Sequence, residues 1–402
     1  MSNRRILIVG GSTRAAADSV RRAGWEPVCA DLFADLDLKM TAEVITVQNY
    51  PHSLPDDVAH VRADGWFYCG ALENSPKILE RIMKKGNFIG PLLGTSPDGL
   101  RGLRNPEWLA KTLKGVGLET LPVANQSSPP VPDGTWVQKP LASAGGRMIR
   151  VWDESAAQTP FPEAHYFQKI AAGIGASVIF QVDSGKVEWL GSARELEAPT
   201  ESAPPSPFSY CGSLGPIHEL PVPAEAKLRK MIQTFVDNVP SLNGFVGLDF
   251  RFDGDEVWLV EVNPRYTASI EVLELSLGQS LLNPLATPGR SNSNPSALAE
   301  MSSSTFCFSP TAEEQNLNQT RIVAKQILYA SESFVSPDLR QFVNASDPWT
   351  IPLMADVPVP GTFVEKGWPI CTVLASGENR QTLESRMKER LRVVWDLLRK
   401  PV

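Results

Sequence analysis

The sequence has no apolar run approaching the roughly 20 residues that cross a bilayer, so we expect no membrane-spanning segment. Histidine is scarce, with 4 among 402 residues, and no Ser-His-Asp or Cys-His arrangement for a nucleophile is evident. The 5 cysteines are scattered without CxxC or other ligand-like spacing, so we expect reduced thiols in a cytoplasmic protein. The net charge of -7 argues against nucleic acid or an anionic membrane as the main partner. An anionic small substrate stays compatible with it.

The first 92 residues have the pattern of a small α/β domain. An apolar run at 4–10 ends in Gly10-Gly11-Ser12, a helical stretch follows, and residues 26–30 are strand-like. This β-α-β order predicts parallel strands, which a further strand at 65–68 and a helix at 76–85 extend. Because a full GxGxxG pattern is missing, a tight turn is favoured over a dinucleotide site.

The remaining chain divides by composition into three parts. The part at 93–282 has a helix at 105–117 and, from 135 to about 275, alternating strands, helices and glycine turns. A stretch rich in Ser, Asn and Pro at 283–304 is typical of a linker. Residues 305–402 contain short strands at 305–308 and 322–329, a β segment rich in turns, and a charged amphipathic helix at 379–398.

The segment GFVGLDFRFDGDEVWLVEVNPR, residues 244–265, predicts a β-hairpin around the turn at 253–255. If Asp249 lies opposite Glu261, one face is wholly apolar: Leu248, Phe250, Phe252, Trp258, Val260 and Val262. The other face then carries Gly247, Asp249, Arg251, Leu259, Glu261 and Asn263. The oxygens of Asp249, Glu261 and Asn263 suit Mg²⁺. A solvated hairpin face with a surface ion pair is the alternative.

Two further segments are candidates for nucleotide binding. In WVQKPLASAGGRMIR, residues 136–150, a strand presents Lys139, and a loop with Gly145 and Gly146 could lay backbone N–H groups along phosphates. In HYFQKI, residues 165–170, a strand could hydrogen-bond an adenine edge, with Phe167 or Ile170 beside the ring. An ordinary core strand is the alternative there.

The order of these segments resembles the ATP-grasp superfamily, over about residues 91–275. Within it the chain is most similar to predicted ATP-dependent carboligases, which share EVNPR followed by a Ser-x-Glu, here Ser269-Ile270-Glu271. The resemblance implies an α/β (α+β) ATP-grasp fold. It also implies an N-terminal Rossmann-like domain at 1–92, an ATP-grasp domain at 93–282 and a small β-rich C-terminal domain at 305–402.

The resemblance also implies a set of functional residues. Lys139 and Arg265 would be catalytic, with Arg265 stabilising the transferring phosphoryl group. The metal ligands would be Asp249, Glu261 and Asn263. The nucleotide site would comprise Lys139, Gly145, Gly146, Phe167, Gln168, Lys169, Ile170 and Leu248. Gln168 replaces a glutamate common in the family, and Arg104 replaces a second nucleotide lysine.

The implied activity is an ATP- and Mg²⁺-dependent ligase that joins a small carboxylate to an amine through an acyl phosphate. One case is the addition of an amino acid such as glutamate in the synthesis of a methanofuran-like cofactor. The alternatives are a carboxylase acting through carboxyphosphate and an ATP-binding module without turnover. We expect small-molecule partners, no nucleic acid and no membrane, and we leave a homodimer open. Residues 210–213 form either a substrate loop or ordinary surface.

Overall fold

The computed structural model describes residues 4–86, 89–282, 321–344 and 346–399. The predicted linker at 283–304 and the predicted strand at 305–308 lie outside these residues. Within them, no helix combines the length and the apolar character needed to cross a bilayer.

The N-terminal region is a four-stranded parallel sheet in the order β3-β2-β1-β4, as the β-α-β pattern predicts. Its strands are β1 (Arg5–Gly10), β2 (Glu26–Asp31), β3 (Glu43–Thr46) and β4 (Gly65–Tyr68). Ile6 and Ile8 pack on one face of this sheet, and Leu7 and Val9 pack on the other. The continuous apolar run of β1 is therefore explained by helices or other elements covering both faces.

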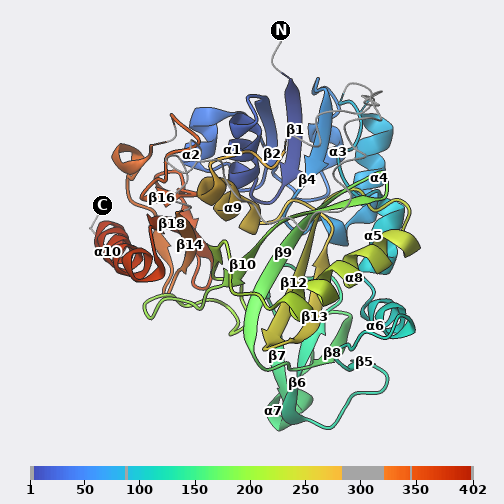
Figure 1. The fold of residues 1–402 in the computed structure, drawn as a ribbon. Helices are drawn as coiled ribbons and strands as arrows, with labels where there is room; N and C mark the ends of the chain where they lie inside the picture. The colour runs from blue at the N-terminus through green and yellow to red at the C-terminus, as the bar shows by residue number, and fades with distance from the viewer. Residues whose placement is uncertain (1–3, 87–88, 283–320, 345, 400–402) are drawn as a thin grey trace, which may run out of the picture.

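A second, eight-stranded sheet forms the centre of the molecule, in the order β13-β12-β9-β10-β11-β14-β18-β16 (Figure 1). Its strands are β9 (Ile174–Asp183), β10 (Lys186–Glu195), β11 (Gly212–Gly215), β12 (Gly244–Asp253), β13 (Glu256–Asn263), β14 (Ile322–Tyr329), β16 (Met354–Ala355) and β18 (Pro369–Gly377). Strand β11 pairs with both β10 and β14. The C-terminal region thus continues the sheet of the central region. The sequence pattern had placed these two regions in separate domains.

A smaller sheet lies against the central one and carries the loop with Gly145 and Gly146, the glycine loop (Figure 1). It has the order β5-β8-β6-β7. Its strands are β5 (Val123–Asn125), β6 (Asp133–Pro140), β7 (Arg150–Asp153) and β8 (His165–Lys169). Lys139 is the penultimate residue of β6, and the glycine loop joins β6 to β7.

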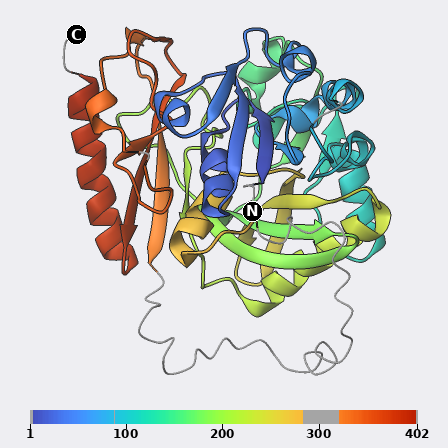
Figure 2. The same cartoon turned by 90° about the horizontal axis from the view of Figure 1, so that it is seen from above.

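Helices cover these sheets and close the molecule at its outer edge. They are α1 (Arg14–Arg22), α2 (Leu36–Thr41), α3 (Leu54–Asp57), α4 (Pro76–Lys85), α5 (Pro97–Leu103), α6 (Pro106–Gly115), α7 (Glu154–Gln158), α8 (Val222–Asn238), α9 (Ser269–Leu277) and α10 (Arg380–Leu398). The short elements are η1 (Leu72–Asn74), η4 (Arg340–Phe342), β15 (Phe334–Val335) and β17 (Phe363–Val364). Helix α8 packs on the central sheet, and α10 packs at the C-terminal edge (Figure 2).

The predicted hairpin is present with the predicted register at its functional end, where Asp249 pairs with Glu261. Beyond that pair the ladder shifts by one residue, so that Phe250 pairs with Leu259. This bulge places Val257 and Leu259 in the core and leaves Trp258 and Val260 outside it. The predicted faces were therefore wrong for Trp258 and Val260, which leave the apolar face, and for Leu259, which joins it, because the extra residue reverses the alternation of β13.

Candidate active site

Two carboxylates and an amide lie together at one end of the β12–β13 hairpin. Asp249 and Glu261 are register partners, and Asn263 pairs with Gly247 two residues further along the ladder. The Asn263 Nδ2 atom donates to Asp249 Oδ2 at 2.7 Å. Directly opposed carboxylates repel one another, so this arrangement requires positive charge nearby.

Arg104 and Lys139 supply part of that charge from outside the hairpin. Arg104, the C-cap of α5, donates from Nη1 to Glu261 Oε1 at 2.5 Å. Lys139 is only 3% exposed and donates from Nζ to Gln168 Oε1 at 3.0 Å. Burial would lower the pKa of Lys139, but the neighbouring Tyr166 and Glu261 raise it above its usual value. The ammonium therefore stays charged in a buried place.

Arg265 is the third cation near the two carboxylates, and it also contacts a residue of the N-terminal region. Its Nη2 atom donates to Asn263 Oδ1 at 3.2 Å, and its Nε donates to Glu73 Oε1 at 2.7 Å. Glu73 is not among the residues that the sequence predicts for the site, because 192 positions separate it from Arg265 and no local pattern marks it.

The two opposed carboxylates differ in their affinity for protons. Burial, together with the charges of Glu195 and Glu261, raises the pKa of Asp249 to about 8. Burial would also raise the pKa of Glu261, but Arg104 and Lys139 outweigh it and lower that pKa. At neutral pH the negative charge of the pair therefore lies on Glu261, and Asp249 holds a proton that a bound cation would displace.

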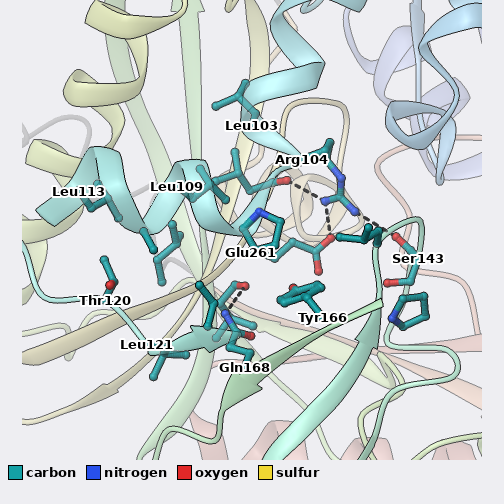
Figure 3. Close-up of a pocket in the computed structure, with 18 residues that line it drawn as sticks. Leu103, Arg104, Leu109, Leu113, Thr120, Leu121, Ser143, Tyr166, Gln168 and Glu261 are labelled. Carbon is teal, nitrogen blue, oxygen red and sulfur yellow. Dashed lines mark hydrogen bonds and ion pairs between the residues drawn. The ribbon is translucent and has the colours of Figure 1, made fainter. Parts of the chain in front are cut away.

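A cavity of about 570 Å³, counting the space open to solvent, adjoins Glu261. Figure 3 shows Arg104 reaching Glu261 and Ser143 on one side of this cavity, with Tyr166 and Gln168 opposite. Its apolar lining comes from the β13 strand and from the segments around α6: Leu103, Leu109, Leu113, Leu121, Val123, Leu259 and Val262. A largely apolar lining with convergent polar groups at one end is typical of a small-molecule site.

The predicted nucleotide residues differ in their relation to this cavity. Gln168 lines it, and its Nε2 atom donates to the Val260 carbonyl oxygen at 3.3 Å. Phe167 points instead into a separate cluster with Trp152, because adjacent residues of a strand face opposite sides.

The other predicted nucleotide residues also lie outside the cavity lining: Lys139, Gly145, Gly146, Lys169, Ile170 and Leu248. Leu248 belongs to the core under the sheet, and Ile170 is 40% exposed. Lys169 donates from Nζ to the Thr135 hydroxyl at 2.6 Å. The hairpin contributes Leu259, Val260 and Val262 to the cavity in place of Leu248.

The glycine loop is held at both ends. Its first part is bound through the Ser143 carbonyl oxygen, which accepts from Arg104 Nη2 at 3.2 Å and from Asn74 Nδ2 at 2.9 Å. Gly146 has a φ of +71° and lies so close to the Phe208 carbonyl oxygen that a Cβ atom would stand 1.7 Å from it. Only glycine fits this conformation and this approach.

Residues 108–269 match the family model of the ATP-grasp domain. The predicted ATP-grasp fold and its mixed α/β class are confirmed. The chain is 21% identical to the Uncharacterized protein MJ0776 of Methanocaldococcus jannaschii, over 96% of this chain and 92% of the relative.

Two solved structures are similar over nearly their whole length. One is the N5-carboxyaminoimidazole synthase of Aspergillus clavatus in complex with ADP, with a TM-score of 0.65, 13% identity, and 98% and 99% of the two chains covered. The other is the L-amino acid ligase of Bacillus licheniformis, with a TM-score of 0.62, 14% identity and 98% of each chain covered. At such identities the likeness concerns the fold.

The donor set of the hairpin is compatible with Mg²⁺. The carboxylates of Asp249 and Glu261 and the amide oxygen of Asn263 are hard oxygen ligands. Across the described ranges, no group of three or more Asp, Glu, His or Cys side chains is placed to hold a metal ion. Water and phosphate oxygens would therefore have to complete the coordination shell, as they usually do for Mg²⁺.

Proposed function

We propose that the protein is an ATP- and Mg²⁺-dependent carboxylate–amine ligase that forms an amide through an acyl phosphate. The observation that carries this proposal is the convergence of Asp249 and Glu261 with Arg104, Lys139 and Arg265, next to a cavity that Arg104 and Glu261 line. Phosphoryl transfer needs positioning and charge stabilisation more than covalent chemistry, and these residues can supply both. The ATP-grasp domain supports the assignment of ATP as the nucleotide.

Each charged residue has a role in this proposal. Lys139 and Arg104 neutralise the nucleotide phosphates from two sides. Asp249, Glu261 and Asn263 would hold Mg²⁺, which supplies charge neutralisation between phosphate oxygens. Arg265 stabilises charge on the transferring phosphoryl group and then on the acyl phosphate.

The reaction has two steps. A substrate carboxylate oxygen attacks the γ-phosphorus, and the bond to the β–γ bridging oxygen breaks to release ADP. The amine nitrogen then attacks the acyl carbon, phosphate leaves, and the amine loses a proton. Because water would hydrolyse the acyl phosphate, the glycine loop around Gly146 would limit its access. An amino acid such as glutamate is the first carboxylate to test, including its addition to an amine in cofactor synthesis.

The decisive experiment is ADP release with ATP and Mg²⁺ against paired panels of carboxylates and amines, with mass spectrometry of the products. We expect ADP, phosphate and an amide in equal amounts with one pair. Glu261→Gln is the matched variant and should remove this turnover while the fold is kept. Normal turnover in Glu261→Gln would refute the role of the acid pair, Asp249 and Glu261, in holding Mg²⁺.

A carboxylase acting through carboxyphosphate is the second candidate. It is favoured by the similarity to the N5-carboxyaminoimidazole synthase, which extends over 98% of this chain. ADP release that requires bicarbonate, and a product heavier by one carboxyl group, would support it. Tight ATP binding without ADP release in any panel would instead support an ATP-binding module.

A further inference from the structure

We infer that Glu73 is a positioning residue that fixes the guanidinium of Arg265 for the reaction. This inference rests on the proposed function for its catalytic consequence. Glu73 lies in η1, directly after the β4 strand of the N-terminal sheet, whereas Arg265 follows the β13 strand of the central sheet. Their contact therefore joins two sheets that the sequence places far apart.

The backbone around both residues is fastened so that this contact is reproducible. Cys69, next to the end of β4, forms a parallel β-bridge with Tyr266, the neighbour of Arg265. The Tyr68 hydroxyl donates to the Pro264 carbonyl oxygen at 3.1 Å. Both residues that flank Arg265 in the chain are thus tied to β4, and the turn after β4 brings Glu73 onto the guanidinium.

The contact itself is strongly buried and uses a specific nitrogen. The side chain of Glu73 is 0% exposed and that of Arg265 is 13% exposed. Glu73 Oε1 accepts from Nε, which leaves Nη2 directed to Asn263 and Nη1 directed to the Tyr266 carbonyl oxygen. A guanidinium held at all three nitrogens has lost most of its rotational freedom before substrate binds, which is what orientation in catalysis requires.

The other oxygen of Glu73 makes the pair more than a structural contact. Glu73 Oε2 is buried and has no protein partner among the described residues. Burying a carboxylate with one oxygen unsatisfied is unfavourable, and a hydrophobic pair would often be at least as stable. We attribute its presence to the orientation of Arg265 and not to stability.

The same turn positions a second cation. Asn74 follows Glu73, and its Oδ1 atom accepts from Arg104 Nε at 3.1 Å. Arg104 in turn binds Glu261. Thus η1 contacts Arg265 through Glu73 and Arg104 through Asn74, and it places both guanidinium groups around the acid pair.

The test compares three variants: Glu73→Gln, Glu73→Asp and the control Glu274→Gln. Glu274 is a matched control because it is also 0% exposed and pairs with an arginine, Arg22, at 2.8 Å, in the contact between α9 and α1. For Glu73→Gln we expect kcat to fall about 10²-fold, because displacing a reacting group by about 1 Å has an effect of that size. We expect the KM for ATP to stay within about twofold, because the lost interaction acts after nucleotide binding.

In Glu73→Asp the carboxylate is kept, but the shorter side chain places it farther from the Nε atom of Arg265. We therefore expect kcat to fall in this variant as well, while the fold is kept. If Glu73→Gln does not fold, the kcat of Glu73→Asp is the test of the inference. Wild-type kcat in folded Glu73→Asp, or an equal loss of kcat in Glu274→Gln, would overturn the inference.

A second measurement separates this inference from the proposed function. In arginine-¹⁵N-labelled protein, the Nε–H signal of Arg265, assigned with Arg265→Lys, should exchange slowly with solvent. It should exchange rapidly in Glu73→Gln and remain slow in Glu274→Gln. Equal exchange in wild type and Glu73→Gln would refute the positioning role. Absence of any turnover in wild type would refute the proposed function without deciding the exchange result.

Discussion

Removal of one buried carboxylate, Glu271, should destabilise the protein strongly. Glu271 is 1% exposed in α9 and accepts from Arg14 Nη2 of the N-terminal helix α1 at 3.1 Å. It also accepts from Lys325 Nζ of the C-terminal strand β14 at 3.1 Å. One carboxylate therefore binds cations from both ends of the chain in the place where the three regions meet.

The size of the effect follows from what Glu271→Gln leaves behind. Arg14 keeps its bonds to Asp356, at 2.9 and 3.1 Å, but the ammonium of Lys325 loses its carboxylate. Breaking a buried ion pair by removing one partner costs about 3–5 kcal/mol. We expect a loss of that size in the free energy of unfolding, measured by urea denaturation at pH 7.

The stabilisation by Glu271 should depend on pH in a definite direction. Burial alone would raise the pKa of Glu271, but Arg14 and Lys325 outweigh it and hold the pKa well below its usual 4.5. The unfolded chain then binds the proton more readily than the native protein, so stability falls as the pH drops below 4.5. Wild type should lose its advantage over Glu271→Gln progressively in that range, because the variant lacks the titrating group.

The control is Glu384→Gln, which removes an exposed ion pair with Arg380 of 2.7 Å length. Such a surface pair contributes about 0.3–0.5 kcal/mol. If Glu271→Gln destabilises no more than Glu384→Gln at pH 7, the reasoning about the buried network is refuted. A difference between wild type and Glu271→Gln that stays constant from pH 7 to pH 3 would refute the electrostatic cause.

Three other predictions address the nucleotide site, the glycine loop and the core. Lys139→Ala should weaken ATP binding about 10- to 100-fold by calorimetry, since a charge-assisted hydrogen bond is lost; unchanged affinity would exclude a phosphate contact. Gly146→Ala should raise the KM for ATP and speed proteolysis of the loop, because the new Cβ atom would clash with the Phe208 carbonyl group. The control Gly145→Ala should have far smaller effects, because Gly145 has a φ of +62° but open space around it. Phe235→Ala, at 0% exposure in α8, should lower the free energy of unfolding by about 3–5 kcal/mol in urea denaturation; a loss below about 1 kcal/mol would contradict its place in the core.

Much of the fold could be predicted because its signals are local. The helix predicted at 379–398 is α10 (Arg380–Leu398), and its start is explained by Asn379 Oδ1, which accepts from the Thr382 N–H at 2.9 Å. The strand-turn-strand alternation at 244–265 predicted both the hairpin and the pairing of Asp249 with Glu261. Each of these patterns is written within about twenty consecutive residues.

The candidate site was predicted in part for the same reason. Asp249, Glu261 and Asn263 share one hairpin, so alternation alone could bring them together. The direction of Phe167 could not be read, since its strand is compatible with either face toward the cavity. The bulge at Val260 escaped prediction as well, because one extra residue in a strand leaves no distinct mark in the sequence.

The sequence by itself determined the order of the motifs, the apolar runs that become strands, and the acid pair of the hairpin. Only the tertiary structure decided that Glu73 holds Arg265, that Arg104 meets Glu261, and that the C-terminal strands join the central sheet through β11. The physical reason is that the spacing of apolar residues fixes which face of a helix or strand a residue occupies, but only within that one element. Which distant segment covers that face depends on how all the buried surfaces pack together.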